Sequence, residues 1–229
     1  MKWLINFFTS SIGRKLIMSL TGLFLILFLT VHLLGNLQLL KNDGGDSFNA
    51  YAYFMTTNPL IKIVAIGNYV FIALHAFLGI IIWLKNRAAK GSKYAVRSNA
   101  KVSWASKNMA LLGTLILAFI FIHMGDFWFK MKWGDIPMVN VTGMDHAVKD
   151  LYTQVATTFS NPLMVAAYVI GLIVLAFHLW HGFQSAFQTL GLNHPKYSPI
   201  IKGLGKIYSI VIPLGYIVIP LYYFFVLNK

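Results

Sequence analysis

Five long apolar runs, separated by shorter polar segments, most constrain what this chain can fold into. Each run reaches the roughly 20 residues that an α-helix needs to cross the hydrocarbon core of a bilayer. We expect spanning helices over residues 15–40, 59–84, 107–129, 162–190 and 204–227, with a long loop at 130–161. Because only helices and closed barrels satisfy every backbone hydrogen bond in lipid, the pattern predicts an all-α integral membrane protein with five transmembrane helices, in one domain over residues 1–229.

Composition excludes several classes of protein. Hydrophobic residues make up 58% of the chain and charged residues 11%, a balance too apolar for a soluble domain. The chain has no Cys, which excludes disulfides, thiolate-bound iron-sulfur clusters and covalently attached c-type haem. It also has no glycine-rich phosphate-binding motif. The first apolar run is too long for the core of a signal peptide, so we expect it to remain as the first helix.

Charged residues are divided unequally between the two sides of the predicted protein. The amino terminus and the loops at 85–107 and 191–206 share one side, which carries only cations, while all six acids lie on the other side. The positive-inside rule therefore predicts that the amino terminus lies in the cytoplasm and the carboxyl terminus outside. We expect the membrane to be the cytoplasmic membrane of a bacterium. Topology and attraction to anionic membrane lipid explain these cations, so no nucleic-acid partner is expected. They are Lys2, Arg14, Lys15, Lys85, Arg87, Lys90, Lys93, Arg97, Lys101, Lys107, Lys196, Lys202 and Lys206.

Two parts of the chain are expected to lie outside the centre of the bundle. Residues 145–159, in the outer loop, have an amphipathic pattern and should form a short helix or lid on the outer face. The fifth span contains no histidine, and we expect it to be peripheral to any cofactor.

An internal pattern recurs in two of the apolar runs. Asn58-Pro59-Leu60 is followed by His75, and Asn161-Pro162-Leu163 is followed at the same interval by His178. Asn is a good N-cap and Pro suits the first helical position, so both helices should begin sharply at the outer surface. Four histidines in the apolar runs, His32, His75, His123 and His178, are each followed by a glycine after two to four residues. Small residues in membrane helices more often serve contact between helices, but these glycines could also give clearance for a cofactor. They are Gly35, Gly79, Gly125 and Gly182.

Four histidines lie within four different runs and fall at two depths. Measured from the nearest charged or polar residue on the cytoplasmic side, His75 and His178 each lie about 15 Å deep at 1.5 Å of rise per residue. On the same measure His32 and His123 lie about 25 Å deep. The sequence therefore pairs His75 with His178 and His32 with His123, at levels about 10 Å apart.

Two pairs of intramembrane imidazoles are what two stacked b-type haems need, each iron being held from opposite sides. A single histidine in a membrane helix can equally serve as a polar contact between helices. That alternative weakens for a matched set, because ionisable groups within the membrane are costly and usually functional. His181 lies one turn after His178 and could replace it as a ligand. We prefer His178 because it repeats the interval of His75, which leaves His181 to bind a haem propionate or to face the cytoplasmic interface.

Three stretches resemble the membrane cytochrome b subunit of succinate:quinone oxidoreductases. They are Ser19 to Phe24 continuing to His32-Leu33-Leu34-Gly35-Asn36-Leu37, then Asn58-Pro59-Leu60-Ile61, and Phe177-His178-Leu179-Trp180-His181-Gly182. The chain is most similar to the cytochrome b558 branch, in which one five-helix polypeptide carries two haem b groups.

That resemblance implies that His32, His75, His123 and His178 are the axial ligands of the haem irons. It implies a flavoprotein subunit and an iron-sulfur subunit on the cytoplasmic face, and menaquinone as the quinone. The chain would then transfer electrons within a succinate dehydrogenase or fumarate reductase of the tricarboxylic acid cycle. The dicarboxylate active site would lie on another subunit.

The quinone site departs from what such proteins would offer, because the chain has no Glu to accept a quinone proton near the outer haem. Asp126 and Asn36 lie just outside the outer ligands and are the candidates, although either residue could simply end its helix. Two other functions stay open. One is the dihaem cytochrome b of a hydrogenase or formate dehydrogenase, and the other is a transporter that uses buried histidines for protons or metal.

Overall fold

The structure is a computed structural model that describes residues 2–89 and 103–227. Within these residues five segments are long and apolar enough to cross a membrane, which confirms the all-α membrane class. Their principal helices are α2 (Ser11–Asn36), α4 (Pro59–Ala89), α6 (Met109–His123), α9 (Pro162–Thr189) and α10 (Ser198–Tyr222). The 3-10 helix η1 (Leu37–Leu40), the π-helices η2 (Met124–Phe129) and η3 (Tyr223–Leu227), and α7 (Lys130–Trp133) extend three of them.

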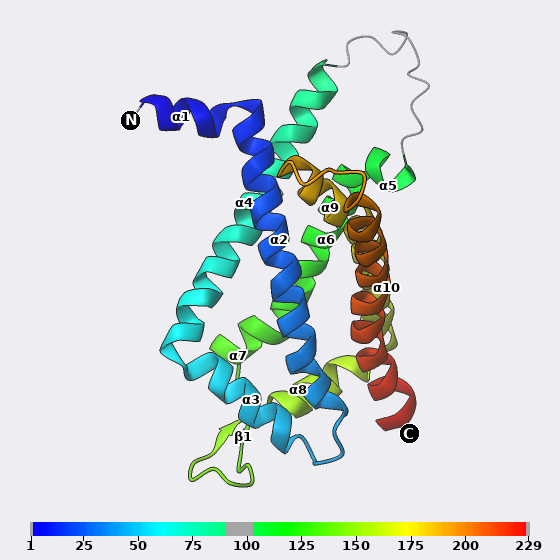
Figure 1. Cartoon of the computed structure of the whole chain (residues 1–229). Coiled ribbons are helices and arrows are strands. Elements are labelled where there is room, and N and C mark those ends of the chain that lie inside the picture. Colours follow the sequence, from blue (N-terminus) through cyan, green and yellow to red (C-terminus); the bar gives the residue numbers. More distant parts are fainter. Residues whose placement is uncertain (1, 90–102, 228–229) are drawn as a thin grey trace.

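Successive spans run in opposite directions, so the bundle has two distinct ends (Figure 1). One end, here called the cationic end, carries Arg14, Lys15, Lys85, Lys202 and Lys206. Helix α1 (Lys2–Thr9) turns away from the bundle at this end, and α5 (Trp104–Lys107) precedes α6 there. The opposite end, here called the ribbon end, carries α3 (Asp46–Thr57), the strands β1 (Met138–Val139) and β2 (Val148–Lys149), and α8 (Leu151–Phe159).

The spans begin and end close to the predicted positions, with two notable differences. The second span continues to Ala89 instead of ending near residue 84, and the fifth begins at Ser198 instead of residue 204. Pro199 lies in the first turn of α10, where its missing N–H costs no hydrogen bond, so the polar start of this segment is helical. Four of the cations assigned to the loop at 85–107 lie outside the described residues: Lys90, Lys93, Arg97 and Lys101.

The outer loop is more ordered than the sequence suggested. Its amphipathic helix is present as α8 but begins at Leu151, because the side chain of Asp150 caps it by accepting a hydrogen bond from the Thr153 N–H. The preceding residues form an antiparallel two-stranded ribbon in which Val139 pairs with Val148. Helix α3, in the loop between the first two spans, was not predicted.

A hydrogen-bond network joins α3 to α8. Asn49 donates from Nδ2 to the Asp150 carboxylate at 3.1 Å and accepts from the Tyr152 N–H at 3.0 Å. Asn49 is buried, so both ends of its amide are satisfied where water cannot replace them. Burial raises the pKa of Asp150, but hydrogen bonds from Thr153 and Asn49 outweigh it and leave the pKa below the ordinary value of 3.8.

Asp150→Ala should therefore destabilise the ribbon end by about 2 kcal/mol, through loss of the helix cap and of the partner of a buried amide. Because the folded pKa of Asp150 is depressed, its contribution should be complete above pH 3.8 and be lost as the pH falls through the folded pKa. Hydrogen exchange of the amides in α8, measured in detergent, should show faster opening in the variant. Equal exchange at neutral pH would contradict the assigned role.

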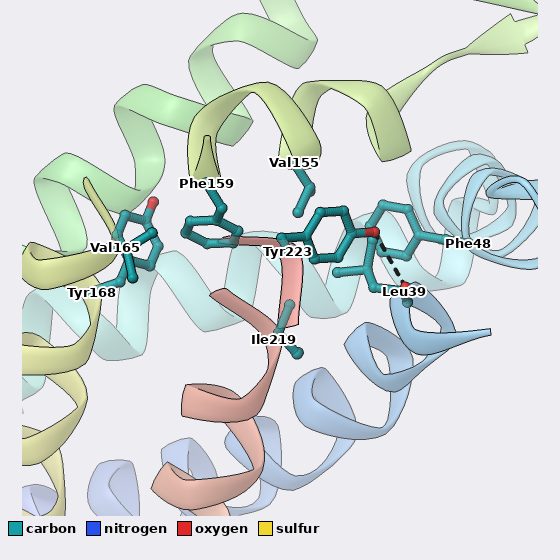
Figure 2. Packing of buried hydrophobic residues seen from close by; sticks show 8 residues of the cluster. All are labelled: Leu39, Phe48, Val155, Phe159, Val165, Tyr168, Ile219 and Tyr223. Carbon is teal, nitrogen blue, oxygen red and sulfur yellow. Dashed lines mark hydrogen bonds between the residues drawn. The ribbon is translucent and has the colours of Figure 1, made fainter. Parts of the chain in front are cut away.

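A buried cluster under α8 ties the ends of three spans together. Figure 2 shows Tyr223 at its centre, with the phenolic hydroxyl donating to the backbone oxygen of Leu39 at 3.2 Å. Phe159 and Val155 of α8 cover it from the ribbon end, and Phe48 of α3 packs against the same group. Helices α3 and α8 are therefore part of the packed core and not a detached lid.

The fifth span packs closely against the first, and its expected place away from any cofactor stays a prediction. Tyr216 of α10 donates its hydroxyl to the Leu29 backbone oxygen at 2.7 Å, and its ring lies 5.9 Å from the ring of His32. The hydroxyl groups of Tyr208 and Thr30 lie 3.0 Å apart and link the same two helices. Sequence periodicity could not show this, because the contacts join residues more than 170 positions apart.

Candidate functional site

The four histidines singled out from the sequence come together as two pairs, each formed between two different spans. His32 of α2 faces His123 at the end of α6, with ring centroids 5.8 Å apart. His75 of α4 faces His178 of α9, with ring centroids 6.2 Å apart. These are the two pairings that depth along the helices predicted, and all four side chains are partly buried.

Both ring separations fit two imidazoles that share one metal ion. A metal–imidazole bond is about 2.0 Å long and a ring nitrogen lies about 1.1 Å from the ring centroid, so two rings on opposite sides of one iron have centroids about 6.2 Å apart. Direct hydrogen bonding between the two rings would need them to lie closer together. The ring planes are inclined at 86° and 67°, which coaxial ligands on one metal permit.

The separation of the two levels follows from two glycines. A Cβ built on Gly22 of α2 would lie 3.2 Å from Cε1 of His75, so His75 is level with Gly22. His32 lies ten residues further along the same helix, which is about 15 Å of rise. On α6, a Cβ on Gly113 would lie 4.0 Å from Cε1 of His178, and His123 follows it by the same ten residues.

Two independent helices thus place the pairs about 15 Å apart, which corrects the separation of about 10 Å expected from the sequence. The separation of about 10 Å assumed that the last polar residue of each helix lies at the same level in the membrane. These residues do not lie at one level.

The glycines that were expected to make room for a cofactor behave differently from one another. A Cβ on Gly35 would clash with the ring of Tyr51, so this glycine makes room for a tyrosine. A Cβ on Gly79 would make an ordinary contact with Met18, at 3.4 Å. At Gly125 and Gly182 no atom of the described residues lies within 4 Å of an added Cβ, so clearance for a cofactor stays a prediction at those two positions.

Aromatic rings surround the His32–His123 pair. Phe28 stacks on His32 with centroids 5.2 Å apart, and Phe127 lies edge-on to His123 at 5.3 Å. The ring of Tyr168 lies 6.0 Å from that of His123. An aromatic and aliphatic environment of this kind excludes water and lowers the local dielectric constant.

Hydrogen bonds to the ring nitrogens differ between the histidines. Nδ1 of His75 lies 3.2 Å from the hydroxyl oxygen of Thr21. Nδ1 of His178 is buried and has no hydrogen-bond partner within the described residues. His181, one turn beyond His178, is partly buried, and the ring that faces His75 is that of His178. The alternative ligand is therefore not the one that the fold pairs with His75.

The two quinone candidates, Asn36 and Asp126, have different surroundings. Asn36 folds back on its own helix, where its Nδ2 donates to the His32 backbone oxygen at 2.7 Å and lies 3.4 Å from His32 Nδ1. Asp126 lies in the π-helix η2, and its carboxylate accepts a hydrogen bond from the Tyr168 hydroxyl at 3.0 Å. A π-helix within a span often marks a functional position.

A cleft of about 340 Å³ lies at the ribbon end, between α3, α7, the ribbon and α8. Thr57, Lys132 and Lys149 contribute polar groups to it, and Met138 and Leu151 contribute apolar surface. None of the site residues predicted from the sequence lines this cleft. The sequence carried no signal for it, because its walls come from elements that meet only in the fold.

Within residues 2–89 and 103–227 there is no group of three or more His, Asp or Glu side chains that could hold a metal ion. The imidazoles meet only two at a time. No family model, curated protein or solved structure matches this chain.

Proposed function

We propose that this chain is the dihaem cytochrome b membrane anchor of a succinate dehydrogenase or fumarate reductase, and that it transfers electrons between an iron-sulfur subunit and menaquinone. The proposal rests on the two pairs of imidazoles. The two rings of each pair have a spacing that suits one iron, and the two pairs lie about 15 Å apart along the bundle. Four unrelated polar contacts would not explain why the same interval occurs on two helices. On both α2 and α6, a glycine that contacts one histidine pair is followed ten residues later by a histidine of the other pair.

The donor set suits haem in particular. A porphyrin supplies four nitrogen ligands, so its iron needs two more from the protein, and each histidine pair offers two. When bound, haem supplies one-electron transfer, and the chain's own residues hold it and set its environment.

The two ends of the bundle suit different partners. Arg14, Lys15, Lys85, Lys202 and Lys206 give the cationic end a positive surface, where the flavoprotein and iron-sulfur subunits would dock on the cytoplasmic side. The His75–His178 pair lies nearer this end and would hold the inner haem. The His32–His123 pair lies nearer the ribbon end and would hold the outer haem, close to menaquinone. The amino terminus would be cytoplasmic and the carboxyl terminus outside.

Asp126 is the better of the two quinone candidates, because Asn36 is engaged with its own helix. Its carboxylate is held by Tyr168, whose ring also contacts His123, so a proton acceptor lies next to the outer pair. Asp126→Asn should slow menaquinol turnover by about 100-fold, as expected for loss of a proton acceptor, and leave haem content unchanged. Steady-state kinetics of the complex with a water-soluble menaquinol analogue would measure this. Turnover equal to that of the unmodified chain would exclude Asp126.

A redox-resolved optical and paramagnetic resonance spectrum of the purified chain tests the main proposal. We expect two b-type haems per chain, each with the low-spin signature of two axial imidazoles. Purification from its native membrane should bring along a subunit with covalent flavin and an iron-sulfur subunit. Hydrogenase or formate dehydrogenase subunits in their place would identify the other dihaem assembly. A chain that binds no haem would favour a histidine-dependent transporter.

A further inference from the structure

Two neighbouring residues of α2 form a seat for the imidazole of His75. The hydroxyl oxygen of Thr21 lies 3.2 Å from Nδ1, and the missing side chain of Gly22 lets the helix backbone approach Cε1 of the same ring. Thr21 is itself buried, with 4% of its surface exposed, so water does not compete for this hydrogen bond. The ring is therefore held along one edge by the Thr21 hydroxyl and the close approach of Gly22, and it also has a hydrogen-bond partner in the Met18 backbone.

The direction of the hydrogen bond follows from the other contacts of Thr21. Its hydroxyl lies 2.8 Å from the Ile17 backbone oxygen and 3.1 Å from that of Met18, and both oxygens are acceptors only. The single hydroxyl hydrogen is thus directed to the helix backbone, a usual bond for threonine in a helix. The oxygen is then free to accept, and we infer that His75 Nδ1 is the donor, which also suits its hydrogen bond with the Met18 backbone. A neutral imidazole that donates from Nδ1 keeps an unprotonated Nε2.

We propose that Thr21 is the positioning residue that fixes His75 in the Nδ1–H tautomer and so presents Nε2 as the metal-binding nitrogen. The part of this inference that concerns the iron rests on the proposed function, whereas the tautomer does not. Partners of this kind orient ligating histidines and increase their basicity, and their loss commonly costs 10–100-fold in metal affinity.

The bond also makes the two sides of the inner pair unequal. Nδ1 of His178, the partner of His75, is buried without a hydrogen bond within the described part of the chain. His75 should therefore be the more basic of the two ligands and should stabilise the more highly charged, oxidised iron. Removing the Thr21 hydroxyl should then raise the midpoint potential of the inner haem and leave the outer haem unchanged.

The chain offers a matched set of variants. Thr21→Val keeps the shape of the side chain and removes its hydroxyl, whereas Thr21→Ser keeps the hydroxyl. Ser19→Ala is the control, because Ser19 is equally buried, at 5% exposed, and donates to the Lys15 backbone oxygen without contacting a histidine. In Thr21→Val we expect the equilibrium of the inner haem to shift about tenfold from the oxidised toward the reduced iron. For a one-electron couple this raises the midpoint potential by about 59 mV. Thr21→Ser and Ser19→Ala should leave the potential at its original value.

The tautomer is measured separately, by nitrogen-15 NMR of histidine-labelled protein prepared without haem. Wild-type protein should show His75 protonated at Nδ1, and Thr21→Val should lose that preference. A wild-type His75 protonated at Nε2 would overturn the inference even if the variant failed to fold, and so would an inner-haem potential that is equal in Thr21→Val and wild type. A wild-type chain that binds no haem but shows the Nδ1–H tautomer would sink the proposed function and leave the positioning role intact.

Discussion

His75→Ala should remove the inner haem and leave the outer haem in place. The alanine offers no ligand, so the iron at this level would keep one axial imidazole, from His178, instead of two. Losing an inner ligand should cost more than the 10–100-fold in affinity that is typical when only its supporting partner is lost. Haem content, measured by the pyridine haemochrome method on purified protein, should fall from two per chain to one.

His32→Ala should have the complementary effect and remove the outer haem, because His32 and His123 form the other pair. The two variants together assign each spectral component to one pair. His194→Ala is the control, since His194 lies exposed in the loop before α10 and should leave both haems bound. Simultaneous loss of both haems in either single variant, with the helical content intact, would argue against two independent sites.

Gly22→Leu should also abolish the inner haem, although residue 22 is not a ligand. Even a Cβ at this position would lie 3.2 Å from His75 Cε1, which is tighter than most Cβ contacts. The additional carbons of leucine would occupy the place of the imidazole and force His75 out of line with His178. We expect haem content to fall to one per chain, with Gly22→Ala showing a smaller loss because a methyl group needs only a slight shift of the ring.

A matched control for this substitution lies in the fifth span. Gly203 is also helical and within a membrane segment, but in the part of the chain that the structure describes no atom lies within 4 Å of a Cβ built on it. Gly203→Leu should therefore keep both haems. Optical spectra of the three variants at equal protein concentration decide the outcome, and two bound haems in Gly22→Leu would refute the close packing of His75 against α2.

Much of the fold could be predicted because the membrane imposes strong local rules. The five spans followed from the lengths of the apolar runs, and the sharp starts of two of them followed from Asn-Pro pairs. In the structure the Asn161 side chain accepts from the Leu163 N–H at 2.9 Å, as an N-cap should. The histidine pairing was also predictable, because depth along a helix depends only on residue number and rise.

The features that the sequence did not reveal all depend on contacts between distant segments. The role of α10 rests on tyrosines that reach α2, and polar aromatic residues in a span carry no periodic signal. Helix α3 is short and only moderately apolar, and it is stabilised by Asn49 and by packing under α8. For the same reason the close contacts of Gly22 and Gly113 became apparent only once the neighbouring helices were placed.

The equal ten-residue registers on α2 and α6 have a consequence for how the protein can vary. Ten residues turn a helix through about 80° less than three full revolutions. Each of the two helices therefore presents its glycine to one histidine pair and its histidine to the other pair from a different face. Inserting one residue between Gly22 and His32 would rotate the histidine by about 100° and displace it by about 1.5 Å. Length changes should therefore be tolerated in the connections at either end and excluded from these two intervals, which fix the distance between the two histidine pairs.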